Sequence, residues 1–259
     1  MDEIRLIACD VDGTLLQQGE TELRPQLFDL IRRLAAQGVE FCVASGRAYS
    51  SVRELFGPVA GQISFVCENG GVVYRDGLLV ARNPVPEDLG REVATAIWQR
   101  EDCELLAADG ETCWMIPRIP ERAEQMKPYM GDRIGVASHP DELPAQLVKV
   151  TAFREEGAAA LLPEFTARWG AKLHVALAGR RWLDVNACTK ATGLAALCGL
   201  VGIQPREVMA FGDNFNDQPM LDWVGRPYVM RGADPALRAL YPAADRPEPV
   251  IEALLNALE

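Results

Sequence analysis

The first part of the chain alternates short, continuously apolar runs with longer stretches whose apolar residues recur every three or four positions. The short runs have the length of buried strands, and the periodic stretches have the spacing of amphipathic helices. The sequence therefore predicts strands at 6–9, 39–44 and 63–67, separated by helices at 25–37 and 49–56. Strands that alternate with helices over short connections indicate a parallel sheet covered on both faces.

The pattern changes after residue 70. Residues 71–81 predict a hairpin with Asp76-Gly77 at its turn, and 83–86 form a connector. Helical and strand-like stretches then alternate as far as residue 181, with helices at 87–99 and 158–169 and strand-like stretches at 105–108, 113–116 and 172–177.

The first pattern resumes near the end of the chain, with a helix at 190–200, a buried strand at 208–211, and helices at 216–223, 235–241 and 248–258. This return indicates that the middle of the chain is an insertion. We therefore predict an α/β protein with a doubly wound parallel-sheet core, residues 1–82 and 182–259, and an inserted α/β cap domain, residues 83–181.

Clusters of polar residues directly follow three of the predicted strands. They are Asp10-Val11-Asp12-Gly13-Thr14, Ser45-Gly46-Arg47 and Gly212-Asp213-Asn214-Phe215-Asn216-Asp217. A fourth candidate, Lys190, begins a predicted helix. Because ligands bind beyond the carboxyl ends of the strands in an open parallel sheet, these segments are expected to converge at one edge.

Four carboxylates gathered in one pocket, from Asp10, Asp12, Asp213 and Asp217, would repel one another and need a cation. A ligand set of oxygen atoms without His or Cys favours Mg²⁺. Mg²⁺ with a lysine opposite, here Lys190, suits the anionic oxygens of a phosphoryl group. These residues alone thus indicate phosphoryl chemistry.

Composition narrows the classes of function. The chain has 26 Lys and Arg against 37 Asp and Glu, so it lacks the basic surface that nucleic-acid binding requires. It has two His, and its seven Cys include no CxxC pair, so a structural zinc site is not expected. No apolar run approaches the roughly 20 residues of a membrane span, and the N-terminus does not read as a signal peptide. We expect a cytoplasmic protein that binds neither nucleic acid nor membranes.

The four polar segments resemble the motifs of the haloacid dehalogenase-like (HAD) superfamily. Residues 10–14 resemble its first motif, Ser45 its second, Lys190 its third, and 212–217 its fourth. The insertion between the second and third motifs, and Asn69 in the stretch Glu-Asn-Gly-Gly, resemble the Cof-type branch with a C2 (IIB-like) α/β cap. The residues that flank Lys190 depart from the usual pattern of that branch, which puts the local turn in doubt rather than the lysine.

The resemblance implies a mechanism. Asp10 would attack phosphorus and form an aspartyl-phosphate, while Asp12 would act as the general acid and then as the base. Mg²⁺ would be held by Asp10, the backbone carbonyl of Asp12, and Asp213, with Asp217 as a ligand directly or through water. Phosphoryl oxygens would bind to the three residues Ser45, Gly46 and Lys190.

Other residues have competing interpretations. Arg47, Asn69, Asn214 and Asn216 could contact substrate or support the site, although a surface ion pair for Arg47 and a turn role for Asn69 are equally compatible with the sequence. Ser45 could simply cap a helix. Within the insertion we expect structural roles for Trp114, His174, Arg180 and Arg181. We expect core positions for Trp98, Trp169 and Trp182.

The leading interpretation is a Mg²⁺-dependent phosphatase, monomer or homodimer, for a small phosphorylated metabolite such as a sugar phosphate. A phosphomutase or phosphotransferase would use the same residues and differ in the acceptor that the cap admits. A non-enzymatic phospho-acceptor module is a remote alternative, because such a fold is about half this length and would give Asp12 no task. Dehalogenation is disfavoured because the acidic fourth motif points to Mg²⁺.

Overall fold

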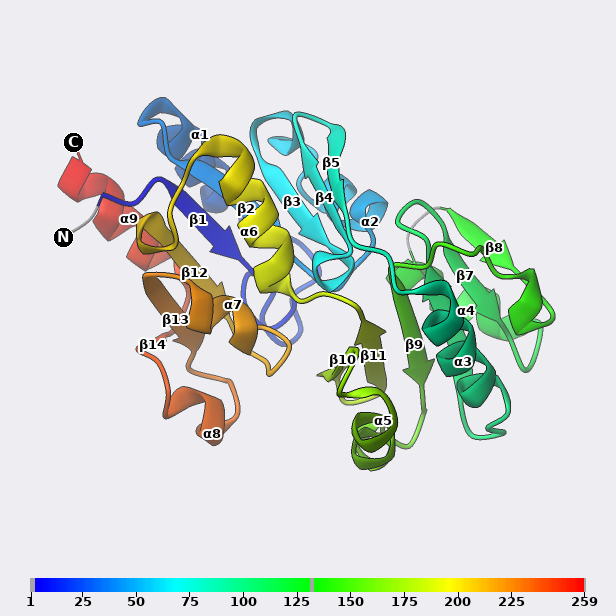
Figure 1. Cartoon of the computed structure of the whole chain (residues 1–259). Helices are drawn as coiled ribbons and strands as arrows, with labels where there is room; N and C mark the ends of the chain where they lie inside the picture. The colour runs from blue at the N-terminus through cyan, green and yellow to red at the C-terminus, as the bar shows by residue number, and fades with distance from the viewer. Residues whose placement is uncertain (1–2, 131–132, 259) are drawn as a thin grey trace.

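The computed structural model describes residues 3–130 and 133–258, which form two α/β units side by side (Figure 1). The larger unit, the core, is built on an eight-stranded sheet. Its strands, in spatial order, are β14 (Ala243–Ala244), β13 (Arg226–Met230), β12 (Val208–Gly212), β1 (Leu6–Cys9), β2 (Glu40–Ala44), β3 (Ser64–Cys67), β4 (Val72–Arg75) and β5 (Leu78–Arg82).

The six strands from β14 to β3 are parallel, and β4 and β5 add an antiparallel hairpin at the edge. β1 lies in the middle, with Leu6 level with Val208 of β12 and with Glu40 of β2. The carboxyl ends of β12, β1, β2 and β3 therefore open on the same edge, where the sequence placed its polar segments.

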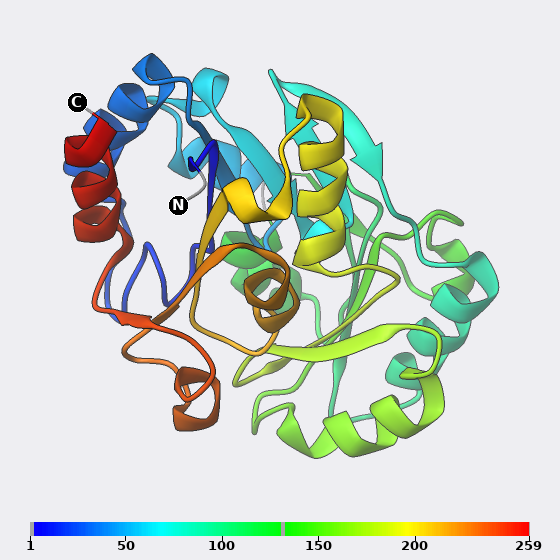
Figure 2. The same cartoon turned by 60° about the vertical axis from the view of Figure 1, so that its left-hand side comes forward.

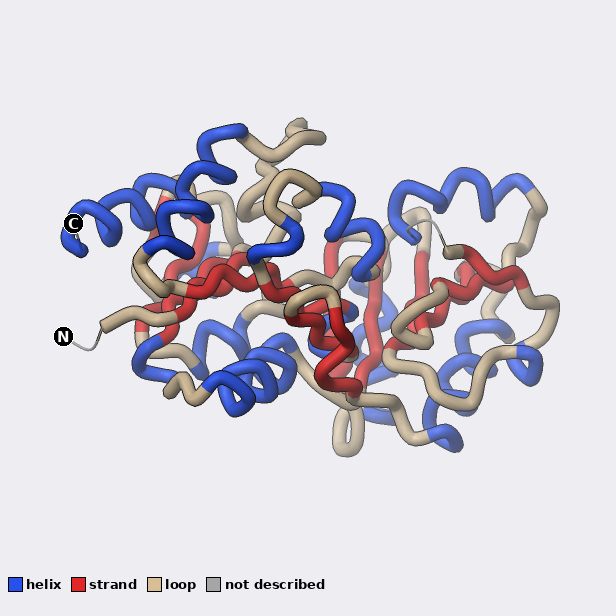
Figure 3. The backbone as a smooth tube through the Cα atoms, turned by 90° about the horizontal axis from the view of Figure 1, so that it is seen from above, coloured by secondary structure: helices blue, strands red, loops and turns tan. Residues whose placement is uncertain are grey.

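Helices cover both faces of the core sheet, as the view from above shows (Figure 3). Side chains of α1 (Pro25–Ala36), α2 (Tyr49–Leu55) and α9 (Pro247–Leu258) pack with Ile7 and Cys9. Side chains of α6 (Lys190–Val201) and α7 (Gln218–Trp223) pack with Leu6 and Ala8 on the opposite face. The side chains of the continuously apolar strand 6–9 thus pack into two hydrophobic cores, one on each face, as expected for a parallel sheet buried on both sides. The short helix α8 (Pro235–Arg238) contacts β13.

The smaller unit, the cap, is built on a six-stranded sheet. Its strands, in spatial order, are β10 (His174–Gly179), β11 (Trp182–Asn186), β9 (Lys149–Phe153), β6 (Glu104–Ala108), β7 (Cys113–Ile116) and β8 (Ile134–Val136). All neighbours are antiparallel except β7 and β8. α3 (Glu87–Trp98) and α5 (Leu162–Trp169) pack on one face, while α4 (Glu121–Met130) packs with Leu106 and Phe153 from the other. Figure 2 shows the cap beside the end of the core that lies away from α9.

The doubly wound core and the second sheet agree with the predicted fold class, but the second sheet extends beyond residue 181. β11 pairs with β9 and β10, so the cap sheet ends at Asn186. We therefore propose a cap domain that spans 83–186. The strands β8, β9, β11, β13 and β14 were not predicted; β13 contains Pro227, which removes a ladder donor and weakens a strand signal. Among the described residues, no helix is long and apolar enough to cross a membrane.

Candidate active site

Asp10 lies at the carboxyl end of β1, where its backbone N–H still donates to the carbonyl of Phe211 on β12 at 3.0 Å. The chain then turns sharply, and the N–H of Gly13 donates to the carbonyl of Leu16 at 2.7 Å. Gly13 has φ +86°, and a Cβ at this position would lie 2.0 Å from Oδ2 of Asp213. Only glycine therefore allows the first loop to approach Asp213 so closely.

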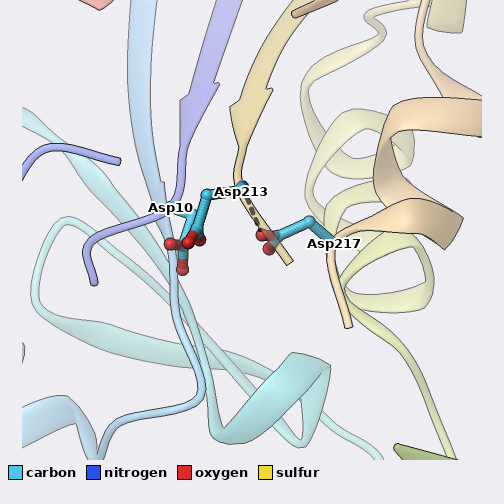
Figure 4. A group of neighbouring side chains, drawn as sticks. All are labelled: Asp10, Asp213 and Asp217. Atoms are coloured by element: carbon cyan, nitrogen blue, oxygen red, sulfur yellow. Dashed lines mark hydrogen bonds between the residues drawn. The ribbon is translucent and has the colours of Figure 1, made fainter. Parts of the chain in front are cut away.

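Asp10, Asp213 and Asp217 gather at this edge of the sheet (Figure 4). Each offers a carboxylate oxygen, and these oxygens lie within 4.8 Å of one another. Burial and the charge of Asp217 raise the pKa of Asp10 well above its usual value. The same two causes raise the pKa of Asp213 to about 7. The cluster is therefore short of positive charge, and its all-oxygen donor set fits Mg²⁺.

Lys190 supplies one positive charge to the cluster. Its Nζ lies 2.5 Å from Oδ1 of Asp10 and 2.5 Å from Oδ1 of Asp217, and its side chain is fully buried. Burial alone would lower the pKa of Lys190, but the carboxylates of Asp10 and Asp217 raise it above its usual value. Lys190 therefore stays charged and holds the nucleophile candidate in place.

The turn before Lys190 is stabilised despite its unusual sequence. Thr189 is the N-cap of α6: its hydroxyl accepts from the N–H of Thr192 at 3.3 Å, and its own N–H donates to the Thr192 hydroxyl at 3.2 Å. Gly193, in the next turn, packs against Gly70, and a Cβ at residue 193 would lie 2.9 Å from the Gly70 Cα. The reciprocal cap thus supplies the local turn that the flanking residues put in doubt.

Asp217 has both carboxylate oxygens engaged. Oδ1 faces Lys190, and Oδ2 accepts from the N–H groups of Asp213 and Asn214 at 2.9 and 3.1 Å. Asp217 therefore orients the loop that carries Asp213. Direct ligation of a metal by Asp217 stays a prediction.

Asp12 lies apart from the acidic cluster, with 58% of its side chain exposed. Arg47 binds it through two hydrogen bonds, from Nε at 2.7 Å and from Nη2 at 2.5 Å. The structure therefore gives Arg47 an ion pair, but one at the mouth of the site rather than on a remote surface. Asp12 is thus not one of the three carboxylates that gather around Lys190, and its carboxylate pairs with Arg47 instead.

The segment Ser45-Gly46-Arg47 lies beside Asp12, which Arg47 binds. Ser45 continues β2 by donating its N–H to the carbonyl of Val66 at 2.8 Å, and its hydroxyl accepts from the N–H of Arg47 at 3.1 Å. The N-cap of α2 is Ala48, so Ser45 is not the helix cap that the sequence left open. Gly46 and Arg47 line the pocket described below.

The sequence left the roles of four residues open, and all four lie near the site: Arg47, described above, and Asn69, Asn214 and Asn216. Asn69 is buried and has φ 56°, and its amide Nδ2 donates to Asp184 of the cap at 2.7 Å. Asn216 donates to Oδ1 of Asn69 at 3.3 Å, and Asn214 accepts from the N–H of Phe215 at 2.8 Å. Asn214 and Asn216 line the pocket, whereas Asn69 does not and links Asn216 to Asp184 through hydrogen bonds.

A pocket of about 390 Å³ lies between the core and the cap. The core contributes Asp10, Asp12, Gly46, Arg47, Asp213, Asn214 and Asn216. The cap contributes Leu106, Ala107, Cys113, Lys149, Thr151, Ala178, Gly179, Arg180, Arg181, Trp182 and Asp184. Asp10, Asp12 and Asp213 thus lie on the core side of the pocket, whereas Ser45, Lys190 and Asp217 are buried next to them and do not line it.

Several cap residues line the pocket without having been assigned to it from the sequence. Arg180, Arg181 and Trp182 are among them, although Arg181 also pairs with Glu155 at 2.7 Å and Trp182 packs against a hydrophobic cluster of the cap, in keeping with the structural and core positions expected for them. Trp114 donates to Asp109 at 2.9 Å and Trp169 is buried in the cap core, as expected. The pocket-lining residues of the cap strands share a signal in the sequence, because every second side chain of a strand points to the same face. Lys149 and Thr151 share one face of β9 in this way, and Trp182 and Asp184 share one face of β11.

Comparisons with known proteins identify the family of this chain and agree with its fold. The family model of the haloacid dehalogenase-like hydrolases matches residues 7–243. The 5-amino-6-(5-phospho-D-ribitylamino)uracil phosphatase of Escherichia coli (strain K12) is 29% identical over 91% of this chain and 88% of its own length. An HMP-PP phosphatase of Escherichia fergusonii is 27% identical over 92% and 88%. The solved structure of the HAD subclass IIB sugar phosphatase BT4131 superposes with a TM-score of 0.80 at 17% identity, covering 98% of this chain and all of that one.

Proposed function

Because this chain belongs to the haloacid dehalogenase-like hydrolase family and is a phosphatase of that family, we propose that it removes phosphate from a small phosphorylated metabolite through an aspartyl-phosphate on Asp10. The observation that carries this proposal is the meeting of Asp10, Asp213, Asp217 and Lys190 at one edge of the sheet. A buried carboxylate that is held by a lysine and opens on a pocket is placed to attack a phosphoryl group.

In the proposed first half-reaction, Asp10 is the nucleophile and Asp12 is the general acid. A carboxylate oxygen of Asp10 attacks phosphorus, and the bond from phosphorus to the ester oxygen breaks. The leaving oxygen takes a proton from Asp12, which lies in the pocket and outside the acidic cluster. Such a positioned acid contributes about 10²–10⁴ in rate.

The second half-reaction returns the enzyme to its starting state. Asp12, now a carboxylate, takes a proton from a water molecule that attacks the same phosphorus. The bond between phosphorus and Asp10 breaks, and inorganic phosphate leaves. Lys190 and the Ser45-Gly46 segment bind phosphoryl oxygens as their charge changes in both steps.

Mg²⁺ would be held by Asp10, the backbone carbonyl of Asp12, and Asp213, with Asp217 next to them. When bound, it would supply charge neutralisation between the carboxylate nucleophile and the phosphoryl group. The raised pKa values of Asp10 and Asp213 support this assignment, because the two carboxylates lack sufficient positive charge without a cation.

The substrate class rests on the size of the pocket and on the relatives. About 390 Å³ is the volume of a small-molecule site, which is roughly 300–1,000 Å³. One relative acts on 5-amino-6-(5-phospho-D-ribitylamino)uracil, another on HMP-PP, and a third is a sugar phosphatase. The shared element is a small phosphorylated metabolite.

The test is hydrolysis of p-nitrophenyl phosphate with Mg²⁺, with EDTA, and by Asp10→Asn, next to a panel of phosphorylated metabolites. We expect EDTA and the substitution each to abolish turnover, with a fall of at least about 10⁴ for Asp10→Asn. Asp29→Asn, on the exposed side of α1, is the matched control and should be fully active.

Hydroxylamine should trap the acyl-phosphate in the wild type and not in Asp10→Asn. Turnover that survives the substitution would show that another group is the nucleophile. Release of a phosphorylated product, rather than inorganic phosphate, would favour the phosphotransferase alternative.

A further inference from the structure

A second lysine, Lys149, reaches from the cap into the core. It is the first residue of β9, and its side chain is only 14% exposed. Its Nζ donates to the backbone carbonyl of Gly46 at 2.7 Å and lies 2.5 Å from Oε2 of Glu68, whose side chain is 4% exposed. A cap residue thus contacts the segment that is placed to bind phosphate.

The three consecutive carbonyls of the Ser45-Gly46-Arg47 segment each accept a hydrogen bond. The carbonyl of Ser45 accepts from the N–H of Asn69 at 3.1 Å, that of Gly46 from Lys149, and that of Arg47 from the N–H of Glu68 at 3.2 Å. In a trans peptide the N–H points away from the C=O. Fixing these carbonyls therefore fixes the directions of the N–H groups that follow them.

The turn that holds two of these carbonyls is itself strained. Glu68 and Asn69 have φ values of 52° and 56°, in the left-handed region that residues other than glycine avoid. Such a conformation persists only when neighbours hold it. Asn216 of the core donates to Asn69, and two further neighbours are in the cap, because Lys149 pairs with Glu68 and Asp184 accepts from Asn69 at 2.7 Å.

Asp184 is well placed for this task. It is buried, and its other oxygen accepts from the hydroxyl of Thr151 at 2.7 Å. The neighbouring carboxylates of Glu68 and Asp184 raise the pKa of Lys149, although burial alone would lower it, so this lysine stays charged. Lys149 therefore presents a charged donor to the strained turn, and Asp184 presents a buried acceptor whose other oxygen is fixed by Thr151.

We propose that Lys149 is a positioning residue for phosphate binding, which holds the Ser45-Gly46-Arg47 segment in its phosphate-binding shape from the cap. This inference rests on the proposed function, since it concerns the same phosphate. It assigns the cap a part in binding the phosphoryl group, in addition to enclosing the rest of the substrate. Because Lys149 and Gly46 belong to different units, their hydrogen bond requires the arrangement of cap and core seen here.

The test compares Lys149→Met with Lys149→Arg and with the control Lys172→Met, which changes an exposed cap lysine. Binding of inorganic phosphate in the presence of Mg²⁺ is measured by isothermal titration calorimetry, and KM and kcat are measured with p-nitrophenyl phosphate. We expect Lys149→Met to weaken phosphate binding and to raise KM about tenfold, the effect of losing one hydrogen bond from a charged donor, with a smaller change in kcat. Lys149→Arg should recover part of the affinity, and Lys172→Met should match the wild type.

A purely structural role would give a different pattern. Lys149→Met would then unfold at a lower temperature but would bind phosphate like the wild type while folded, and that result would overturn the proposal. If Lys149→Met does not fold, Glu68→Gln serves instead, because it removes the charge that anchors Lys149; we expect about threefold weaker phosphate binding. Wild-type affinity in Glu68→Gln would also contradict the proposal.

The binding measurement keeps this inference separate from the proposed function. A wild type that binds phosphate but hydrolyses no ester would refute the phosphatase mechanism and leave the comparison of Lys149 variants valid. A wild type that binds no phosphate would refute both. Normal turnover with unchanged phosphate binding in Lys149→Met would refute the role of Lys149 alone.

Discussion

Lys190 and Lys149 each lie beside carboxylates, one in the catalytic centre and one where the cap meets the core. Lys190 is fully buried and bridges Asp10 and Asp217, so both of its partners are candidates for the chemistry. Lys149 pairs with Glu68 and with a backbone carbonyl, neither of which would touch the reacting atoms. The same side chain can therefore stabilise a transition state in one place and shape a binding loop in the other.

Replacing Lys190 gives the largest effect in this comparison. Lys190→Met removes the cation from a buried acidic cluster, so kcat should fall about 10²–10³, as for the loss of one donor to a developing anion. Lys190→Arg should not rescue activity, because a planar guanidinium does not fit a fully buried gap between two carboxylates only 2.5 Å from the nitrogen. Steady-state kinetics with p-nitrophenyl phosphate measures both variants.

Substitutions of Lys190 and of Lys149 should differ in the kinetic or binding constant that they change. Lys190 substitutions should act mainly on kcat, and Lys149 substitutions mainly on KM and phosphate affinity. Equal losses of kcat in Lys190→Met and Lys149→Met would contradict this division of roles.

The sequence predicted one of these lysines and not the other, for a physical reason. Lys190 is the first residue of a helix, α6, that packs on the core sheet beside the edge where the polar loops meet, and it resembles the third motif of the family. Lys149 lies within a strand, where its neighbours depend on the pairing of β9 with β6 and β11 and on how the cap sits against the core. Periodicity shows that Lys149 and Thr151 share a face, but not what lies opposite.

The same reason explains why the border predicted at residue 181 differs from the border proposed at residue 186. Residues 174–186 form the hairpin of β10 and β11, with Arg180 and Arg181 at its turn, and the predicted border cut this hairpin in two. Pairing between strands decides to which sheet β11 belongs, and the apolar pattern of 182–186 suits either one. Placing β11 in the cap also brings Trp182 and Asp184 to the pocket.

Binding of Mg²⁺ to the cluster of Asp10, Asp213 and Asp217 should stabilise the folded protein by an amount that depends on pH. The pKa of Asp213 is raised to about 7 in the folded, metal-free protein, so its stabilising contribution is present at low pH and is lost as pH rises through 7. Asp10 shifts in the same direction. Saturating Mg²⁺ should therefore raise the unfolding temperature by about 5 °C or more at pH 8 and by less at pH 5.

Thermal unfolding with Mg²⁺ and with EDTA at both pH values checks this expectation. Asp213→Asn is the informative variant, because it removes one titrating carboxylate and should flatten the pH dependence of the metal-free protein. Glu68→Gln, at the junction with the cap, should keep the Mg²⁺ effect. If Mg²⁺ raises the unfolding temperature equally at both pH values, the pKa values of Asp10 and Asp213 are not raised as stated.

The smallest expected effect concerns Arg180, at the turn between β10 and β11. Arg180 is exposed and lines the pocket, and among the described residues no hydrogen bond or ion pair of its side chain is seen, whereas Arg181 pairs with Glu155 at 2.7 Å. Arg180→Gln should leave kcat/KM for p-nitrophenyl phosphate unchanged and alter it about threefold for the preferred metabolite, since an exposed charge contributes little. Arg32→Gln on α1 is the control. If the ratio between metabolite and p-nitrophenyl phosphate stays constant in Arg180→Gln, the turn of this hairpin does not contact the leaving group, and selection by the cap must come from the residues deeper in the pocket, such as Trp182 and Thr151.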